Sequence, residues 1–194
     1  MTLKERINRI FCTSCIELAG KAYEGKYELN NSKSIKGFIL RRLRGKIKNL
    51  DTGDNITISK RSVLKLASHL KDGEAYQKTL AHIPQIIEKM QFLEEMKPDK
   101  GIENPSFENY SYYITGVNID GELHTILSTV GKMGNEIYYD QNVFKGTPKE
   151  VFIEAKISID NKYSRLKEIL KDNENSDWSQ IGIALPETPT AIYL

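Results

Sequence analysis

The sequence predicts an α+β fold in which helices come first, an antiparallel sheet follows and one further helix comes near the end of the chain. Two observations lead to this prediction. Apolar residues recur at helical spacing through most of the first half, and runs of strand-forming residues separated by short turns follow after residue 109. Helices and strands that are segregated in this way favour an antiparallel sheet, whereas regular alternation would favour a parallel one.

The first half of the chain predicts four helices and one hairpin. Ser59 is a suitable N-cap for the third helix, and Gly45 stands where the second helix would end. A turn sequence at residues 51–55 separates two short runs of strand-forming residues, which predicts a hairpin over residues 46–59. The expected helices span residues 3–22, 34–43, 60–70 and 80–95.

The second half predicts most of the sheet. Asp120-Gly121 is a typical sequence for a two-residue hairpin loop, and strand-forming residues stand on both sides of it. Residues 151–159 alternate between apolar and polar side chains, as a half-buried strand does. The expected strands span residues 110–119, 123–130, 136–140 and 151–159, followed by a helix over 161–170 and a last strand over 181–185.

These elements divide the chain into three expected parts. Residues 46–160 would form an α+β domain, and residues 161–194 would form a C-terminal helix and tail. Residues 1–45 have two interpretations, because a helical arm of its own and an integral part of the α+β domain both agree with the pattern.

Composition and charge narrow the function classes. The 194 residues carry a net charge of +2, with 39% hydrophobic and 28% charged residues, which is ordinary for a soluble globular protein. No apolar run approaches the ~18 residues that a membrane span needs, and the charged N-terminus lacks the apolar core of a signal peptide. We therefore expect a cytoplasmic protein with no membrane partner.

The motifs of several enzyme classes are missing from the sequence. It contains no phosphate-binding loop, no serine-hydrolase elbow and no H-E-x-x-H zinc motif. Cys12 and Cys15 form a single C-x-x-C without a second pair of ligands, and they fall within the first expected helix. We expect two half-buried helix cysteines, no metal site and no cofactor.

A basic segment stands out in the charge distribution. No acidic residue occurs between Glu28 and Asp51, and such a block can neutralise phosphates, although it is equally typical of a solvated helix face. Arg41, Arg42 and Arg44 are its candidate nucleic-acid-binding residues. The basic residues of the segment are Lys33, Lys36, Arg41, Arg42, Arg44, Lys46 and Lys48.

Further candidate site residues lie on the third expected helix and in the expected sheet. Arg61, Lys65 and His69 follow one another at intervals of four residues, on a different helix face from the apolar stripe. Their mutual repulsion would be relieved by a bound anion or by a nearby acid. The sequence adds Lys60 beside them and three residues on expected strands: Tyr112, His124 and Asp140.

A series of short motifs occurs in a fixed order and spacing over roughly residues 46–159. The motifs are Gly53, Ile56-Thr57-Ile58-Ser59-Lys60, Lys65, the Pro84 helix, Lys97-Pro98-Asp99, Tyr112-Tyr113, Asp120-Gly121 and Tyr138-Tyr139-Asp140. With this series the chain resembles a family of phage-derived domains, which occur in large polyvalent proteins of phages and mobile elements. These domains are assigned to the barnase/EndoU/colicin/RelE-like nuclease superfamily.

The resemblance implies one or two helices followed by a curved antiparallel sheet of about four strands. It also implies a toxin-like endoribonuclease that needs no metal, in which the 2′-hydroxyl of RNA attacks the adjacent phosphate. This reaction needs a general base, a general acid and cations for the phosphorane charge. The implied partners are RNA and either a protein inhibitor or a parent polyvalent protein.

The implied roles can be placed on individual residues. Lys65 would be the phosphate cation, and His69 would be the acid or base, since its ordinary pKa of about 6.5 suits either task. Tyr112 would hold a base by stacking or donate a hydrogen bond, and Asp140 would orient His69. Lys60 and Arg61 would supplement the positive charge.

The sequence departs from the family pattern at two positions. A basic residue is expected near Leu127 and a histidine at Gln141, and His124 is a candidate replacement for the missing basic residue. The alternative hypothesis is therefore a catalytically degenerate domain of the same fold, which binds nucleic acid or a protein without cleavage.

Overall fold

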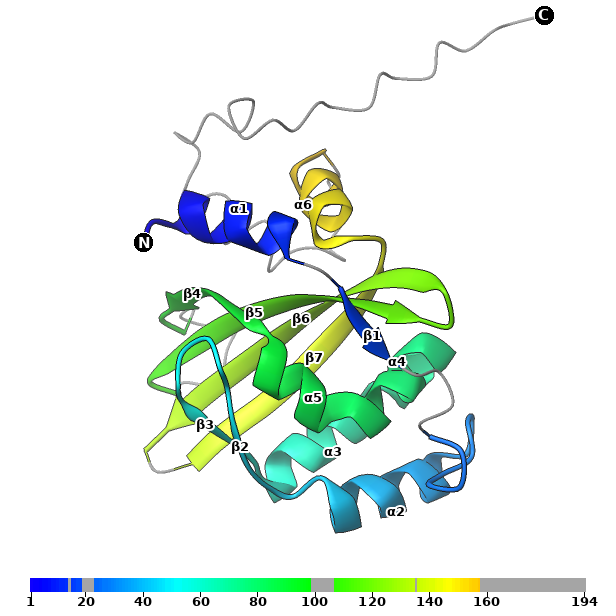
Figure 1. Ribbon diagram of the computed structural model, residues 1–194. Helices are drawn as coiled ribbons and strands as arrows, with labels where there is room; N and C mark the ends of the chain where they lie inside the picture. The colour runs from blue at the N-terminus through cyan, green and yellow to red at the C-terminus, as the bar shows by residue number, and fades with distance from the viewer. Residues whose placement is uncertain (14, 19–22, 99–106, 135, 158–194) are drawn as a thin grey trace, which may run out of the picture. The chain divides into compact units, whose positions relative to one another are not determined.

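The computed structural model in Figure 1 describes residues 1–13, 15–18, 23–98, 107–134 and 136–157. The α-helices are α1 (Leu3–Cys12), α2 (Ser32–Arg42), α3 (Lys60–Ser68), α4 (Glu74–Thr79), α5 (Ile83–Lys89) and α6 (Pro148–Ile157). The strands are β1 (Ile16–Leu18), β2 (Gly45–Lys48), β3 (Asn55–Ile58), β4 (Gln91–Met96), β5 (Asn109–Ile119), β6 (Glu122–Met133) and β7 (Glu136–Lys145). Short 3-10 turns, η1 (Leu70–Asp72) and η2 (Leu80–His82), flank α4.

The main sheet has five strands and is mixed. Its strand order is β1-β5-β6-β7, and β4 also pairs with β5. β4 runs antiparallel to the first half of β5 and β1 runs parallel to its last residues, so both lie along the same edge of the long strand. The expected combination of helices with a sheet is confirmed. The expected all-antiparallel arrangement of about four strands is wrong, because β1 is a parallel strand.

The long hairpin of β5 and β6 is confirmed where the sequence predicted it. Asp120 and Gly121 both have positive φ angles, 55° and 86°, as the mirror-image turns of two-residue hairpins require. The two strands pair without interruption from Asn109 with Lys132 to Ile119 with Glu122. The predicted two-stranded hairpin over residues 46–59 is also confirmed as the separate sheet of β2 and β3.

One face of the main sheet packs against α3, α4 and α5, and α2 packs against α3, as Figure 1 shows. Side chains of the four helices meet those of β5 and β7 in one buried cluster, which includes Ile39, Leu66, Ile83, Tyr113 and Tyr139. Burial of such side chains is the main favourable term in folding. The core therefore fixes α3 against the sheet.

Three predicted elements are corrected by the structure. The first helix ends at Cys12, because Thr13 is extended and residues 16–18 join the sheet as β1. Cys12 is the last residue of the helix but is exposed, and Cys15 is partly buried but lies beyond the helix, so neither is a half-buried helix cysteine. The helix expected over 80–95 ends at Lys89, because Met90 is extended and β4 follows.

The third correction concerns the strand expected over residues 151–159, where the structure has α6. Thr147 and Glu150 exchange side-chain and backbone hydrogen bonds in a capping box, and Pro148 opens the helix between them. These N-terminal signals determine the local structure despite the alternating pattern that follows. The helix expected over 161–170 and the strand over 181–185 lie outside the described residues.

The helices and strands up to residue 151 form one compact unit. Within this unit, Tyr27, Ile35, Phe38 and Ile39 belong to the same buried cluster as Tyr139. In the part of the chain that the structure describes, no helix is both long and apolar enough to cross a membrane.

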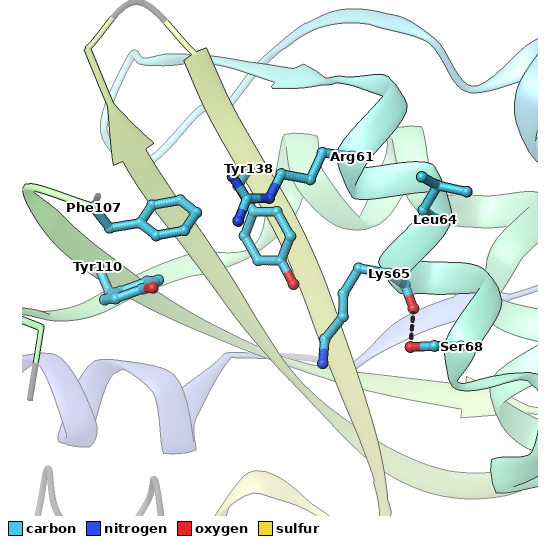
Figure 2. Close-up of a pocket in the computed structure, with 7 residues that line it drawn as sticks. All are labelled: Arg61, Leu64, Lys65, Ser68, Phe107, Tyr110 and Tyr138. Atoms are coloured by element: carbon cyan, nitrogen blue, oxygen red, sulfur yellow. Dashed lines mark hydrogen bonds between the residues drawn. The ribbon is translucent and has the colours of Figure 1, made fainter. Parts of the chain in front are cut away.

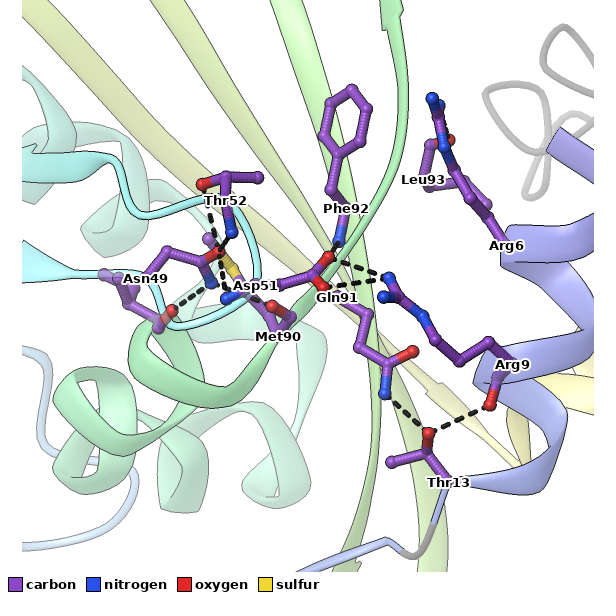
Figure 3. Close-up of polar contacts among 11 residues, drawn as sticks. Arg6, Arg9, Thr13, Asn49, Asp51, Thr52, Met90, Gln91, Phe92 and Leu93 are labelled. Carbon is purple, nitrogen blue, oxygen red and sulfur yellow. Dashed lines mark hydrogen bonds and ion pairs between the residues drawn. The ribbon is translucent and has the colours of Figure 1, made fainter. Parts of the chain in front are cut away.

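A fully buried asparagine connects the β2–β3 turn to the break between α5 and β4 (Figure 3). The Asn49 side-chain amide donates to the carbonyls of Ile87 and Met90, both at 2.8 Å. Its oxygen accepts from the backbone N–H groups of Asp51 and Thr52 and from the Thr52 hydroxyl. One side chain thus satisfies both the end of a helix and a tight turn, which explains why the chain leaves α5 at Met90.

Replacing this side chain tests its importance. We expect Asn49→Ala to lower the free energy of unfolding by about 2–4 kcal/mol, because buried carbonyl and N–H groups lose their partners. Urea unfolding of the variant and of Asn55→Ala, an exposed asparagine in β3, provides the comparison. Equal stability of the two variants would contradict this assignment.

Candidate functional site

The candidate site is built by α3 and β7. The Ser59 and Ser62 side chains cap the start of α3, and the burial of Val63 and Leu66 directs Arg61, Leu64 and Lys65 away from the core. The buried Ser62 hydroxyl also accepts the backbone N–H of Tyr139 at 3.0 Å. This hydrogen bond holds α3 beside β7.

Lys65, His69 and Asp140 come together at this junction. The Asp140 carboxylate lies 3.8 Å from Lys65 Nζ through Oδ2 and 3.5 Å from His69 Nε2 through Oδ1. Its side chain is 12% exposed, whereas that of Lys65 is 43% exposed. The residues proposed from the sequence as phosphate cation, acid or base, and orienting carboxylate therefore share one location.

The imidazole of His69 lies between two carboxylates. Its Nδ1 contacts Asp72 Oδ2 at 2.8 Å, and its Nε2 faces Asp140 Oδ1. Both Nε2 and Oδ1 are buried, and neither has a hydrogen bond of good geometry within the described ranges. A histidine flanked in this way is stabilised in its charged form.

The charges around His69 shift its pKa upward. The Asp140 carboxylate raises the pKa above the ordinary value, burial opposes that effect, and Asp72 raises the pKa further. The positive charge of Lys65 works in the opposite direction. His69 therefore carries a proton over a wider pH range than an isolated histidine.

Lys65, His69 and Asp140 form the Asp140 cluster, and a hollow of about 440 Å³ adjoins it at Lys65. Figure 2 shows this hollow. The Arg61 guanidinium lies 5.1 Å from the centre of the Phe107 ring and 6.0 Å from that of Tyr138. These distances fit cation–π contacts. The residues that line the hollow are Arg61, Leu64, Lys65, Ser68, Phe107, Tyr110 and Tyr138.

The aromatic rings of the hollow rest on a glycine. Gly131 of β6 pairs with Tyr110 on one side and Tyr138 on the other, so both tyrosines flank it on the same sheet face. A Cβ atom at Gly131 would come within 2.7 Å of the Phe107 ring and 2.9 Å of the Tyr110 ring. The absence of a side chain at Gly131 therefore leaves the space that the rings of Phe107 and Tyr110 occupy.

Tyr112 and His124 do not line this hollow. Tyr112 is 1% exposed and is separated from Asp140 by Thr129, which places the two backbones about 10 Å apart across the sheet. His124 stands five residues from Thr129 on β6, about 17 Å along the strand and on the opposite face. The aromatic residues of the hollow are instead Tyr138, Tyr110 and Phe107, which the sequence interpretation did not select.

The two departures from the family pattern are buried. Gln141 is 0% exposed, accepts from the Tyr139 hydroxyl at 2.8 Å and donates to Thr79 Oγ1 at 2.7 Å. Leu127 is 1% exposed. Both side chains pack inside the protein, so neither position faces the hollow in this chain.

The basic segment forms a second charged surface on α2 and β2. Its seven lysines and arginines are exposed, and none has a carboxylate within 4.0 Å among the described residues. Lys26, Arg41 and Arg42 line a second hollow of about 490 Å³ together with Phe38 and Pro84. Lys60 is also exposed, but it lies outside this surface, at the start of α3 and next to Arg61.

The environment of His69 leads to a pH prediction. Because its pKa is raised in the folded state, the charged imidazole stabilises the protein fully below about pH 6.5, the unfolded pKa. This contribution is lost as pH rises through the folded pKa. The stability difference between wild type and His69→Gln should therefore shrink from about pH 5 to about pH 9.

An NMR titration of the imidazole would measure the folded pKa directly. Asp72→Asn should lower that pKa, because it removes the carboxylate that contacts Nδ1. A folded pKa at or below about 6.5 in the wild type would contradict this electrostatic account.

Comparison with known proteins places the chain in a family. The family model described as large polyvalent protein-associated domain 3 matches residues 26–139, which is more than half of the chain and includes α2, α3 and most of the sheet. No curated protein and no solved structure matches. Within the described ranges, no three His, Cys, Asp or Glu side chains are grouped as a metal site requires. The chain belongs to the large polyvalent protein-associated domain 3 family.

Proposed function

We propose that this domain binds single-stranded RNA along α3 and β7 and cleaves it without a metal ion. The observation that carries the proposal is the meeting of Lys65, His69 and Asp140 beside a hollow lined by Arg61 and aromatic rings. RNA cleavage by its own 2′-hydroxyl needs a proton acceptor, a proton donor and positive charge near the phosphate. The cluster contains a group of each kind.

In the proposed reaction, the Asp140 carboxylate takes the proton of the 2′-hydroxyl while the 2′-oxygen attacks phosphorus. The bond from phosphorus to the 5′-oxygen breaks, and protonated His69 supplies the proton that the leaving 5′-oxygen needs. The products are a cyclic phosphate and a free 5′-hydroxyl. Lys65 and Arg61 stabilise the charge that gathers on the phosphate oxygens.

The short separation between the acid and the base offers a way to regenerate the site. After cleavage Asp140 would hold a proton and His69 would lack one, and 3.5 Å separates their facing atoms. A small movement would bring them to hydrogen-bond distance, so the proton can return without passing through solvent. The raised pKa of His69 favours the same final state.

Cleavage assays in EDTA test this function. We expect wild-type protein to cut single-stranded RNA, and Lys65→Ala and Asp140→Asn each to reduce the rate by about a hundredfold or more. Lys89→Ala removes an exposed lysine on α5 and should keep full activity. Intact RNA after incubation with folded wild type, or full activity of Lys65→Ala, would overturn the assignment.

A second candidate function is RNA binding without cleavage. Two observations favour it: both ring nitrogens of His69 face carboxylates, and the exposed basic segment has no acidic partner among the residues described. In this case His69 and Asp140 would hold α3 against β7, and the basic segment would contact phosphates. The family description adds that the domain is associated with large polyvalent proteins, so we propose that either activity serves such a parent protein.

The salt dependence of RNA binding tests the role of the basic segment. Replacing Arg41, Arg42 and Arg44 together by alanine should reduce the slope of log affinity against log salt by about two, since each single-stranded phosphate contact contributes ~0.7. A triple alanine variant of Lys89, Lys145 and Lys149, which are exposed elsewhere, should retain the wild-type slope. Equal slopes in both triple variants would contradict a phosphate-binding role for the segment.

A further inference from the structure

We propose that the hollow beside α3 is a subsite for one nucleobase of the bound RNA, with a preference for purines. The hollow is defined by Arg61, Phe107, Tyr110 and Tyr138, and Lys65 forms the side that continues into the Asp140 cluster. This inference rests on the proposed RNA binding and specifies what the hollow recognises.

The chemistry of the walls suits a flat, uncharged, aromatic ligand. Three rings and a planar guanidinium surround the space, and bases stack on such groups whatever their sequence. The volume of about 440 Å³ falls within the range of small-molecule sites, about 300–1,000 Å³. Arg61 itself is exposed, so a base can stack on its guanidinium or take its place over the rings.

The rings are held in position before any ligand arrives. Phe107 and Tyr110 lie with their ring centres 5.0 Å apart, and Phe107 meets Tyr138 edge-on at 5.5 Å. The backbone N–H of Glu108 donates to the Lys132 carbonyl at 2.8 Å, which ties this stretch to β6. A stacking surface that needs no reordering binds with a smaller entropic cost.

The position of Lys65 relates the base to the reacting phosphate. Lys65 lines the hollow, as Figure 2 shows, and also lies 3.8 Å from Asp140. A nucleotide whose base enters the hollow therefore has its phosphate beside the cluster. The Tyr138 hydroxyl is protonated at neutral pH and can donate a hydrogen bond, and burial raises its pKa further. Because the three rings and the guanidinium offer stacking surfaces, we expect purines to be preferred for their larger stacking face.

The test uses 2′-O-methyl oligonucleotides of about ten units, which lack the attacking hydroxyl and are not cleaved. One series carries adenine, one carries uracil, and one lacks bases while keeping the same phosphates. Wild type should bind the adenine series about tenfold more tightly than the baseless series, with uracil between them. Because no cleavage is involved, this result is independent of whether the domain is a nuclease.

Substitutions of residues that line the hollow test whether the base binds there. Arg61→Ala and Tyr138→Leu should each reduce the preference for adenine over the baseless series, whereas Lys89→Ala removes an exposed charge on α5 and should preserve that preference. Arg61 and Lys89 are both exposed, so these two variants should fold, and thermal unfolding checks all three. Wild-type binding that ignores the bases, or an adenine preference unchanged in both Arg61→Ala and Tyr138→Leu, would overturn the subsite.

A final binding measurement distinguishes an RNA subsite from a site for a free nucleotide. Adenosine monophosphate alone should bind far more weakly than the adenine oligonucleotide, because it lacks the neighbouring phosphates. Equal affinity for the mononucleotide would overturn the proposal of an RNA subsite. Loss of cleavage in Lys65→Ala together with base-independent binding would leave the nuclease proposal intact and reject the subsite alone.

Discussion

The hydrogen bond from the Tyr139 backbone to the Ser62 hydroxyl connects the two elements on which the candidate site depends. Ser62 is 0% exposed and belongs to the capping box that starts α3, so the same hydroxyl begins the helix and joins it to β7. Residues 61, 65 and 69 follow at helical spacing, and residues 138 and 140 follow at strand spacing. Once this junction is fixed, the arginine, the lysine, the histidine, the tyrosine and the carboxylate have fixed relative positions.

The site combines opposing charges in a small volume. Lys65 and His69 face Asp140, and Asp72 faces the other side of the imidazole. Removal of one member would leave a partly buried charge without its partner, which is costly for stability. The same arrangement that suits acid–base chemistry therefore also holds the end of α3 in place. For this reason the proposed functions are distinguished by RNA cleavage and RNA binding rather than by stability alone.

Local features of the sequence predicted much of the fold. The α3 face with Lys65 and His69 follows from helical spacing and the Ser59 cap, and the β5–β6 hairpin follows from Asp120-Gly121. Local sequence features could not predict the parallel pairing of β1, because it joins residues 16–18 to residues 117–119, which are far apart in the chain. The capping box at Thr147 and Glu150 was readable in the sequence, and it outweighs the alternation that predicted a strand.

Only part of the candidate site was predictable, because local sequence features indicate a helix face but not the register of paired strands. Lys65 and His69 lie on one helix face, whereas the choice among the tyrosines needed the register of three strands. That register places Tyr110 and Tyr138 on either side of Gly131 and leaves Tyr112 outside the hollow. Phe107 could be found only from its packing over Gly131, since it precedes the strand pattern.

The most direct test of a single RNA site is an NMR titration of the backbone amides with a 2′-O-methyl oligonucleotide. We expect the changes to concentrate on residues 61–69, 107–110 and 138–140, which are separate in sequence and adjacent only in this fold. Changes confined to α2 and β2, with the junction of α3 and β7 unaffected, would contradict it.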